Sequence, residues 1–164
     1  MANPVEPWMR GTLTEVEPVR RAVLHALELA GEDVLVWCEG LSEVEMFARP
    51  AGLPHVAFQL RHMVRSLDRL LTYAEGRQLS EEQLAALKTE MDAGSVAEVM
   101  VEFREGLVRG MERARAISPE SFAEARGVGR KMLPTTVAGL LIHCAEHTQR
   151  HVGQMITTVK VCRQ

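Results

Sequence analysis

The chain has 164 residues and a formal net charge of −3 at neutral pH, with 19 basic and 22 acidic side chains. Aromatic residues make up only 4% of the sequence, and the mixed charges form no basic stripe, so nucleic acid is not an expected partner. No apolar run approaches the roughly 18 residues of a membrane span, and the N-terminal residues show no secretion signal. We therefore expect a cytoplasmic protein that does not act at a membrane.

The length suits a single domain, residues 1–164, which would bury about 70% of the surface that its unfolded chain exposes. Leu, Ala, Glu, Met, Val and Arg dominate, and this composition favours helices over a sheet. The cysteines form no spaced framework, and their odd number fits a reducing compartment. We expect free thiols in helical core positions at Cys38, Cys144 and Cys162.

Helical periodicity and capping signals divide the first half of the chain into two long helices and a short one. The first long helix is expected from about Thr14 to Cys38, with a capping box at 14–17 and with Pro18 as a point where its start could shift or bend. Ser42 caps a short helix. The second long helix is expected from about Pro54 to Glu75, because proline suits a first-turn position and a glycine follows.

The second half contains two further long helices. Capping boxes begin a shorter helix at 80–91 and the third long helix at 95–117. Residues 127–134 are interpreted as a loop, and a threonine caps the last helix over about 136–161. We therefore predict an all-α fold, a four-helix bundle with short additional helices, in which the long middle connection permits parallel neighbours.

The last predicted helix carries His143, His147 and His151 at a spacing of four residues. Residues four apart lie on one helix face, so two imidazoles can reach one metal ion at a distance of about 2.0–2.1 Å. The apolar stripe of this helix contains His151 and has His147 at its margin, whereas His143 lies roughly 100° from its centre. We therefore select His147 and His151 as the inward pair, with Gln154 beside them. Hydrogen-bonded core histidines are the alternative.

Three segments carry a resemblance to a known family: 57–70, 129–136 and the closing H-x-x-x-H-x-G-Q motif at 147–154. Together they resemble the DinB-like (DinB/YfiT) superfamily over nearly the whole chain. The resemblance implies an up-down-down-up four-helix bundle, frequently a homodimer, with a divalent metal held by one histidine of the second long helix and two of the fourth. In this sequence those histidines are His62, His147 and His151.

His62 does not lie on the apolar stripe of its helix but about 140° from the centre of that stripe. It shares its face with His55, Phe58 and Tyr73. For His62 to bind a metal this face must line a cavity, and aromatic groups among polar ones are typical of a site wall. An exposed face with a lone histidine is the alternative. His55 is the alternative ligand from this helix.

The chemistry of such a site follows from its ligands. Three neutral imidazoles leave the metal its full charge and an open coordination position, as in catalytic sites. Zinc is the expected ion, and imidazoles also accept nickel, iron or copper. Such an ion can ionise a bound water or a thiol. The residues expected around the metal or the substrate, without being ligands, are His143, Gln154, His55, Tyr73 and Arg130.

The resemblance implies enzymes that use low-molecular-weight thiols, because characterised relatives include thiol transferases and isomerases. The leading hypothesis is a metal-dependent S-transferase, in which a bound thiol ionises and attacks a small electrophilic substrate. Arg126, Arg130 and Lys131 could hold a carboxylate of that thiol, or they could be solvated loop charges. The sequence identifies no catalytic residue.

Two alternatives belong to other classes of protein. His143, Glu146 and His147 match the H-x-x-E-H motif of inverted zinc peptidases, an interpretation that needs the outward-facing His143 as a ligand. The other alternative is a non-catalytic helical bundle that binds metal or a small ligand. Such a bundle could dimerise through Ile142 and Ile156, which lie away from the core stripe.

Overall fold

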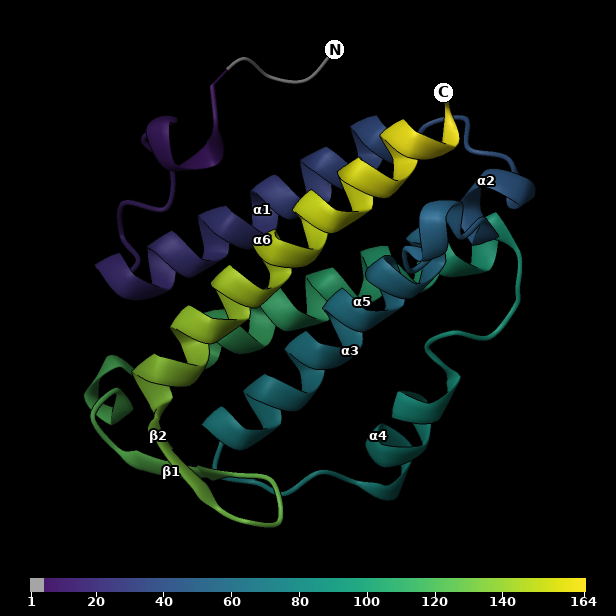
Figure 1. The fold of residues 1–164 in the computed structure, drawn as a ribbon. Coiled ribbons are helices and arrows are strands. Elements are labelled where there is room, and N and C mark those ends of the chain that lie inside the picture. Colours follow the sequence, from purple (N-terminus) through teal and green to yellow (C-terminus); the bar gives the residue numbers. More distant parts are fainter. Residues whose placement is uncertain (1–4) are drawn as a thin grey trace.

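The computed structural model describes residues 5–164, and most of them are helical (Figure 1). In chain order, with η for 3-10 helices, the elements are η1 (Pro7–Met9), α1 (Pro18–Cys38), α2 (Glu43–Phe47), η2 (Pro50–Gly52), α3 (Val56–Ala74), α4 (Glu81–Ala86), η3 (Leu87–Thr89), α5 (Val96–Ala116), η4 (Pro119–Ser121), β1 (Ala125–Val128), β2 (Leu133–Thr136) and α6 (Val137–Cys162). The predicted helical class is confirmed, with one small sheet added. Within the described residues, no helix is long and apolar enough to cross a membrane.

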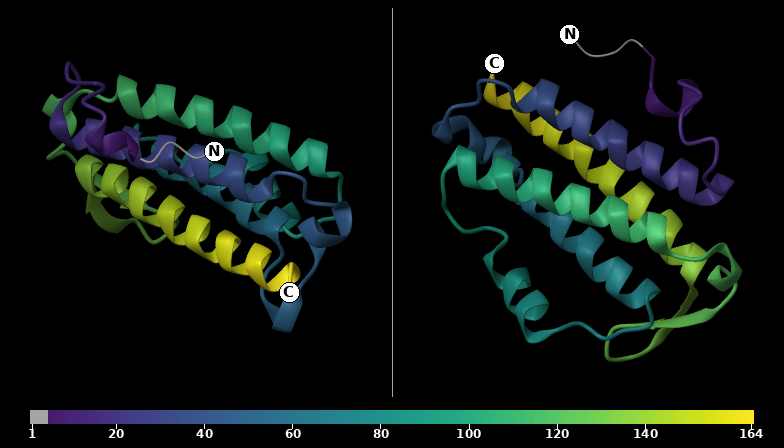
Figure 2. Two further views of the ribbon diagram at one scale, coloured as in Figure 1. Left: turned by 90° about the horizontal axis from the view of Figure 1, so that it is seen from above. Right: turned by 180° about the vertical axis from the view of Figure 1, so that it is seen from behind.

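The long helices α1, α3, α5 and α6 lie side by side. Helix α6 packs against α1 and α3, and α3 also packs against α5. The colour gradient shows α1 and α6 running towards the end where the C-terminus lies, and α3 and α5 running away from it (Figures 1 and 2). The α3–α6 contact matters most for function, because the predicted ligands come from these two helices.

The predicted capping boxes form as expected at three helices. Ser42, Ser80 and Ser95 each accept a hydrogen bond from the third residue of the following helix, whose side chain accepts one in return. Thr136 caps α6 by accepting from the Gly139 amide. These side chains satisfy backbone donors that the first helical turn leaves unpaired, which explains why the short sequence patterns located the N-termini.

Two helix starts differ from the prediction. Helix α1 begins at Pro18, because the Glu17 carboxylate accepts from two amides of the first turn and replaces the expected box at 14–17. Helix α3 begins at Val56 instead of Pro54, because the Nδ1 atom of His55 accepts from the Phe58 amide at 2.8 Å. A ring nitrogen thus performs the capping role that hydroxyl and carboxylate oxygens usually have.

The second half of the chain departs from prediction in two places. The helix expected over 80–91 is shorter, because the α-helix ends at Ala86 and a 3-10 turn follows. The loop expected at 127–134 is wrong, since these residues belong to an antiparallel hairpin in which Val128 pairs with Leu133. Strands of four half-buried or exposed residues are too short to show the alternation of apolar and polar side chains that identifies a strand.

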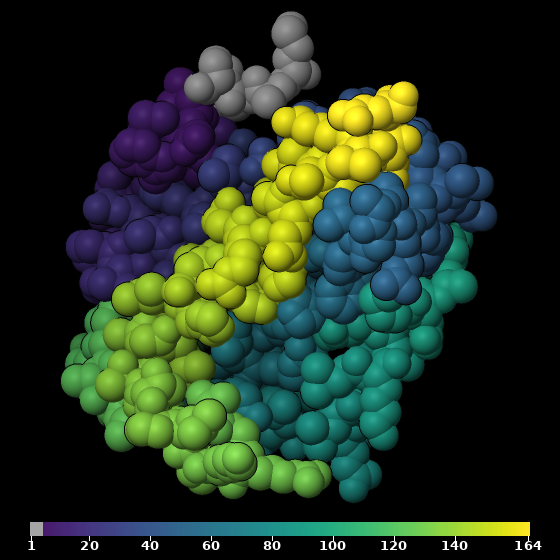
Figure 3. All heavy atoms as spheres, in the orientation of Figure 1, coloured from purple at the N-terminus to yellow at the C-terminus, as the bar shows by residue number. Residues whose placement is uncertain are grey.

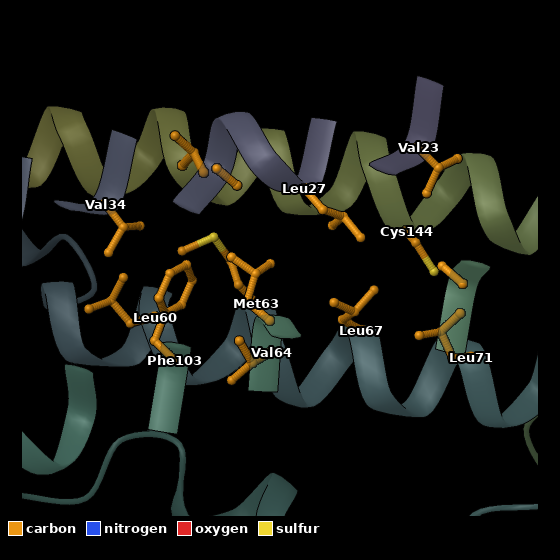
Figure 4. Packing of buried hydrophobic residues seen from close by; sticks show 14 of the residues in the cluster. Val23, Leu27, Val34, Leu60, Met63, Val64, Leu67, Leu71, Phe103 and Cys144 are labelled. Atoms are coloured by element: carbon orange, nitrogen blue, oxygen red, sulfur yellow. The ribbon is translucent and has the colours of Figure 1, made fainter. Parts of the chain in front are cut away.

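The core is formed by side chains from all four long helices (Figure 4). Leu27 of α1, Leu60 and Leu67 of α3, Phe103 of α5 and Cys144 of α6 point into the same interior. Such interdigitation fixes the spacing of α3 and α6, and hence the separation of the histidines that they carry.

The cysteines are free, with Cys38 and Cys144 buried and Cys162 half-buried. Burial raises the pKa of Cys38 and the pKa of Cys144 to about 12. Because the thiolate is the reactive form, both buried side chains remain unreactive thiols at neutral pH. Their role is to fill the core.

Candidate metal centre

The helices α3 and α6 bring three of the predicted histidines together. The ring of His62 lies 4.4 Å from that of His151 and 5.1 Å from that of His147, measured between centroids. The rings of His147 and His151 are 4.5 Å apart. One nitrogen atom from each ring lies within 4.8 Å of the others, so the three side chains could hold one metal ion. All three are half-buried.

His62 is oriented by Glu90, a buried residue that follows η3 and is 5% exposed. The Nδ1–H group of His62 donates to Oε2 of Glu90 at 2.7 Å. The other carboxylate oxygen accepts from Nη1 of Arg69 at 3.1 Å. This arrangement commits Nδ1 to the carboxylate and places the lone pair of His62 on Nε2.

A closed ring of hydrogen bonds surrounds this pair. Nη2 of Arg69 donates to Oγ of Ser66 at 2.8 Å, and the Ser66 hydroxyl lies 3.4 Å from Nε2 of His62. Phe58 stacks on a face of the imidazole, with ring centroids 5.2 Å apart. His62 is therefore held by contacts at both ring nitrogens and on one face of the ring. The side of α3 that carries His62 lines a site instead of facing solvent.

His151 has an equivalent partner in Gln59 of α3, which is 1% exposed. The Nδ1–H group of His151 donates to Oε1 of Gln59 at 2.6 Å. This hydrogen bond again assigns the proton to Nδ1, so that Nε2 carries the lone pair. Within residues 5–164, His147 has no hydrogen-bond partner, which is unlike the satisfied core histidine of the alternative interpretation.

Burial and mutual repulsion keep two of the imidazoles neutral. Burial lowers the pKa of His147 to about 4, and the positive charges that its neighbours His151 and His62 would carry contribute in the same direction. Burial, His62 and Arg150 likewise lower the pKa of His151 to about 4. The neutral form is the one that binds metals.

Glu90 is ionised beside these imidazoles. Burial alone would raise the pKa of its carboxyl, but the hydrogen bond from His62, the charge that His62 would carry if protonated and the charge of Arg69 outweigh burial and lower it. The centre therefore contains one buried negative charge that is paired with a half-buried guanidinium. Such pairing is what makes a buried carboxylate tolerable.

The structure places His143 and Tyr73 beside His147, on the wall of one cavity. The His143 side chain is 43% exposed, and its Nδ1 atom lies 3.7 Å from a carboxylate oxygen of Glu146, which is also exposed. The three-histidine group does not include His143. This geometry does not favour the H-x-x-E-H peptidase interpretation, which requires His143 as a ligand.

The other predicted neighbours lie elsewhere, except for Gln154. His55 caps α3 and its Nε2 atom lies 3.3 Å from the Met91 carbonyl oxygen, so it is occupied outside the group. Arg130 is exposed at the tip of the hairpin. Arg126 donates from Nε to the Ala74 carbonyl oxygen at 2.9 Å, which ties the hairpin to the end of α3. Gln154 lies beside the centre as expected: its side chain forms a hydrogen bond with His151 that favours the protonated imidazole, and it lines a second cavity together with Gln59.

The sequence prediction missed Glu90 and Gln59. Gln59 precedes His62 by three residues on one helix, so a search for polar residues one turn from a candidate ligand would have found it. Glu90 lies in an irregular segment, where neither periodicity nor spacing connects it to a histidine 28 positions earlier. Only the path of the chain brings it into the centre.

The described fold and site define a helical protein with a three-histidine centre between two long helices. Residues 26–155 match the model of the DinB superfamily, and this match covers most of the chain. The chain therefore belongs to the DinB superfamily, which confirms the resemblance noted in its sequence. A comparison with curated proteins found no match.

Proposed function

We propose that this protein is a metal-dependent S-transferase or a related enzyme, which activates a low-molecular-weight thiol for attack on a small electrophile. The observation that carries the proposal is the convergence of His62, His147 and His151 with their neighbouring hydrogen bonds in place. Membership of the DinB superfamily supports it. We propose zinc as the ion, with nickel or iron as alternatives, because imidazole ligands accept all of these.

The side chains present fit a divalent ion. Two nitrogen atoms bound to one ion at about 2.1 Å can be no more than about 4.2 Å apart. The nitrogens of His62, His147 and His151 lie within 4.8 Å of one another, so small side-chain rotations suffice to bring them to that spacing. Glu90 and Gln59 hold the Nδ1–H groups of two of the rings, which is the usual outer support of metal-binding histidines.

A divalent ion bound there would supply the positive charge that favours the thiolate form of a coordinated thiol. In the transfer, the thiolate sulfur forms a bond to carbon while the leaving group departs with its bonding electrons, and the thiol proton passes to solvent. Cys38 and Cys144 do not compete as nucleophiles, because burial raises the pKa of each to about 12. This supports a nucleophile that comes from a small molecule.

We also propose that the long helices form an up-down-down-up bundle within a single cytoplasmic domain and that the protein is a homodimer. Helices α1 and α6 run in one direction and α3 and α5 run in the opposite direction, which supports the bundle (Figure 2). Ile142 is 53% exposed beside an apolar groove formed with Pro18 and Val19, which supports a dimer. Ile156 packs against the core instead.

Conjugation kinetics test the proposed activity. The protein is loaded with zinc, nickel or iron and mixed with glutathione, bacillithiol or mycothiol and an aryl halide, and product formation is followed. We expect the wild type to exceed a His147→Ala, His151→Ala double variant with at least one thiol. Equal rates with every thiol and metal would instead support the alternative, a non-catalytic dimeric bundle that binds metal or a small ligand.

A further inference from the structure

A small cavity adjoins the histidine centre, between α3, α6 and the segment 79–87. In Figure 3 the surface dips between α6 and the teal segment around α4, with α3 at the bottom of the dip. The cavity has a volume of about 180 Å³ and includes His147 in its wall. A ligand inside it would therefore lie against one of the three clustered histidines.

The wall of this cavity has an apolar side and a polar side. Leu70, Leu79 and Leu87 supply apolar surface from α3 and from the segment that follows it. Tyr73, His143 and His147 supply polar groups. A mainly apolar pocket with a few polar groups is the usual composition of a small-molecule site, in which the polar groups fix the orientation of the ligand.

Tyr73 is the polar group that points most directly to a ligand. The residue is only 8% exposed, but its hydroxyl oxygen is not buried and has no hydrogen-bond partner among residues 5–164, so it is free to pair with a ligand. A tyrosine hydroxyl in the wall of a pocket can donate one hydrogen bond to a bound molecule. A ligand that offers a hydrogen-bond acceptor can therefore pair with this hydroxyl.

Charge and size narrow the class of ligand. The guanidinium of Arg69 also lines the cavity, but it is already paired with Glu90 and donates to Ser66, so it does not call for an anionic ligand. An apolar cavity of about 150 Å³ holds one benzene ring. A volume of about 180 Å³ therefore suits one six-membered ring with a small substituent.

We propose that this cavity binds a neutral molecule with a single small ring and one hydrogen-bond acceptor, such as a carbonyl oxygen, to which Tyr73 donates. Tyr73 then orients the molecule beside His147. The identification of this molecule as the electrophile rests on the proposed function, whereas the binding itself does not require metal or thiol.

Ligand-observed NMR with metal-free protein tests the binding. Acetophenone is the probe, ethylbenzene lacks its acceptor, and 2-acetonaphthone exceeds its size. We expect acetophenone to bind more tightly than the other two compounds. Tyr73→Phe should weaken acetophenone binding by about 2- to 13-fold, the equivalent of one hydrogen bond, and should leave ethylbenzene binding unchanged. A merely structural role of Tyr73 would change both compounds alike and would overturn the proposal.

A matched pair of substitutions tests whether acetophenone binds inside this cavity. Leu87 is 42% exposed and lines the cavity, whereas Leu84 is 41% exposed and does not line it. Leu87→Trp should fill the cavity and abolish acetophenone binding, and Leu84→Trp should leave it unchanged. Equal binding by the two variants, or no acetophenone binding by the wild type, would overturn the proposal. Binding with this pattern but without thiol conjugation would overturn the proposed function alone.

Discussion

Oε2 of Glu90 lies 2.7 Å from Nδ1 of His62, although the two residues are 28 positions apart in the sequence. The segment that follows α4 and η3 therefore does more than connect α3 to α5. It places the buried carboxylate of Glu90 against Nδ1 of His62, a candidate metal ligand. Through Arg69, this carboxylate also completes a ring of hydrogen bonds around His62. In metal sites such carboxylates orient the imidazole and increase its basicity.

Glu90→Gln should lower the affinity for zinc by about 10- to 100-fold, because the amide keeps the size of the side chain but removes the charge that polarises His62. A competition titration with a chromophoric chelator measures this. Glu102→Gln is the control, since Glu102 pairs with Arg65 at 2.6 Å without contacting a histidine. Equal affinity of both variants would show that Glu90 does not support His62.

Gln59→Leu should lower zinc affinity by about 10-fold or more, because it leaves the Nδ1–H group of His151 without an acceptor in a buried position. Gln149→Leu is the matched control. Gln149 donates to the Ala26 carbonyl oxygen at 2.7 Å and contacts no histidine, so its loss should not change the affinity. The same chelator titration compares the two, and a larger loss with Gln149→Leu would contradict the account.

The metal-free protein should lose stability as the pH falls below about 6.5. The folded-state pKa of His147 and that of His151 are about 4, against an ordinary value of 6.5. The unfolded chain therefore binds more protons than the folded one between these values, and the free energy of unfolding rises with pH across that window. Urea unfolding at pH 5, 6 and 7 in the presence of a chelator measures the slope.

The histidine variants provide the control for this pH effect. His147→Gln should flatten the slope between pH 5 and 6.5, because it removes one of the groups whose pKa is lowered on folding. His143→Gln should retain the wild-type slope, since the His143 side chain is 43% exposed. A slope unchanged by His147→Gln would mean that burial does not disfavour the charged form of this histidine.

Gly110→Ala should destabilise the fold by about 1–3 kcal/mol, because the added Cβ atom would overlap with the Leu67 side chain where α5 packs on α3. Gly153→Ala is the comparison in α6, where a Cβ atom would meet nothing within 4 Å. This change should stabilise the protein by about 0.5–1 kcal/mol, the usual gain in a helix interior. Urea unfolding measures both, and destabilisation by Gly153→Ala would contradict the description of that site.

The sequence was informative where a local pattern has a local structural cause. Ser80 and Ser95 begin helices because their side chains satisfy the first unpaired amides, and such patterns span only four residues. The angular position of His147 and His151 on α6 is similarly local, since it depends on helix geometry alone. The hairpin was missed because its strands are too short to display their period.

Relationships between distant segments could not be predicted in the same way. Helical spacing placed His62 away from the apolar stripe of its helix, where a buried ligand is not expected. The contacts of His62 with Glu90 and Phe58 explain why that face of the helix is nevertheless covered. The resemblance supplied His62 as a candidate, but it did not identify its support. Buried partners such as Gln59 and Glu90 depend on the packing of α3 and on the route of the connection after it.

Zinc binding by single-alanine variants, measured by isothermal titration calorimetry, tests the central claim most directly. The wild type and His143→Ala should each bind about one zinc ion per chain, as a single three-histidine site requires. His62→Ala, His147→Ala and His151→Ala should each bind at least about 100-fold more weakly, since each removes one of the three clustered ligands. Retention of wild-type zinc affinity by His62→Ala, His147→Ala or His151→Ala, or loss of zinc from His143→Ala, would contradict the account.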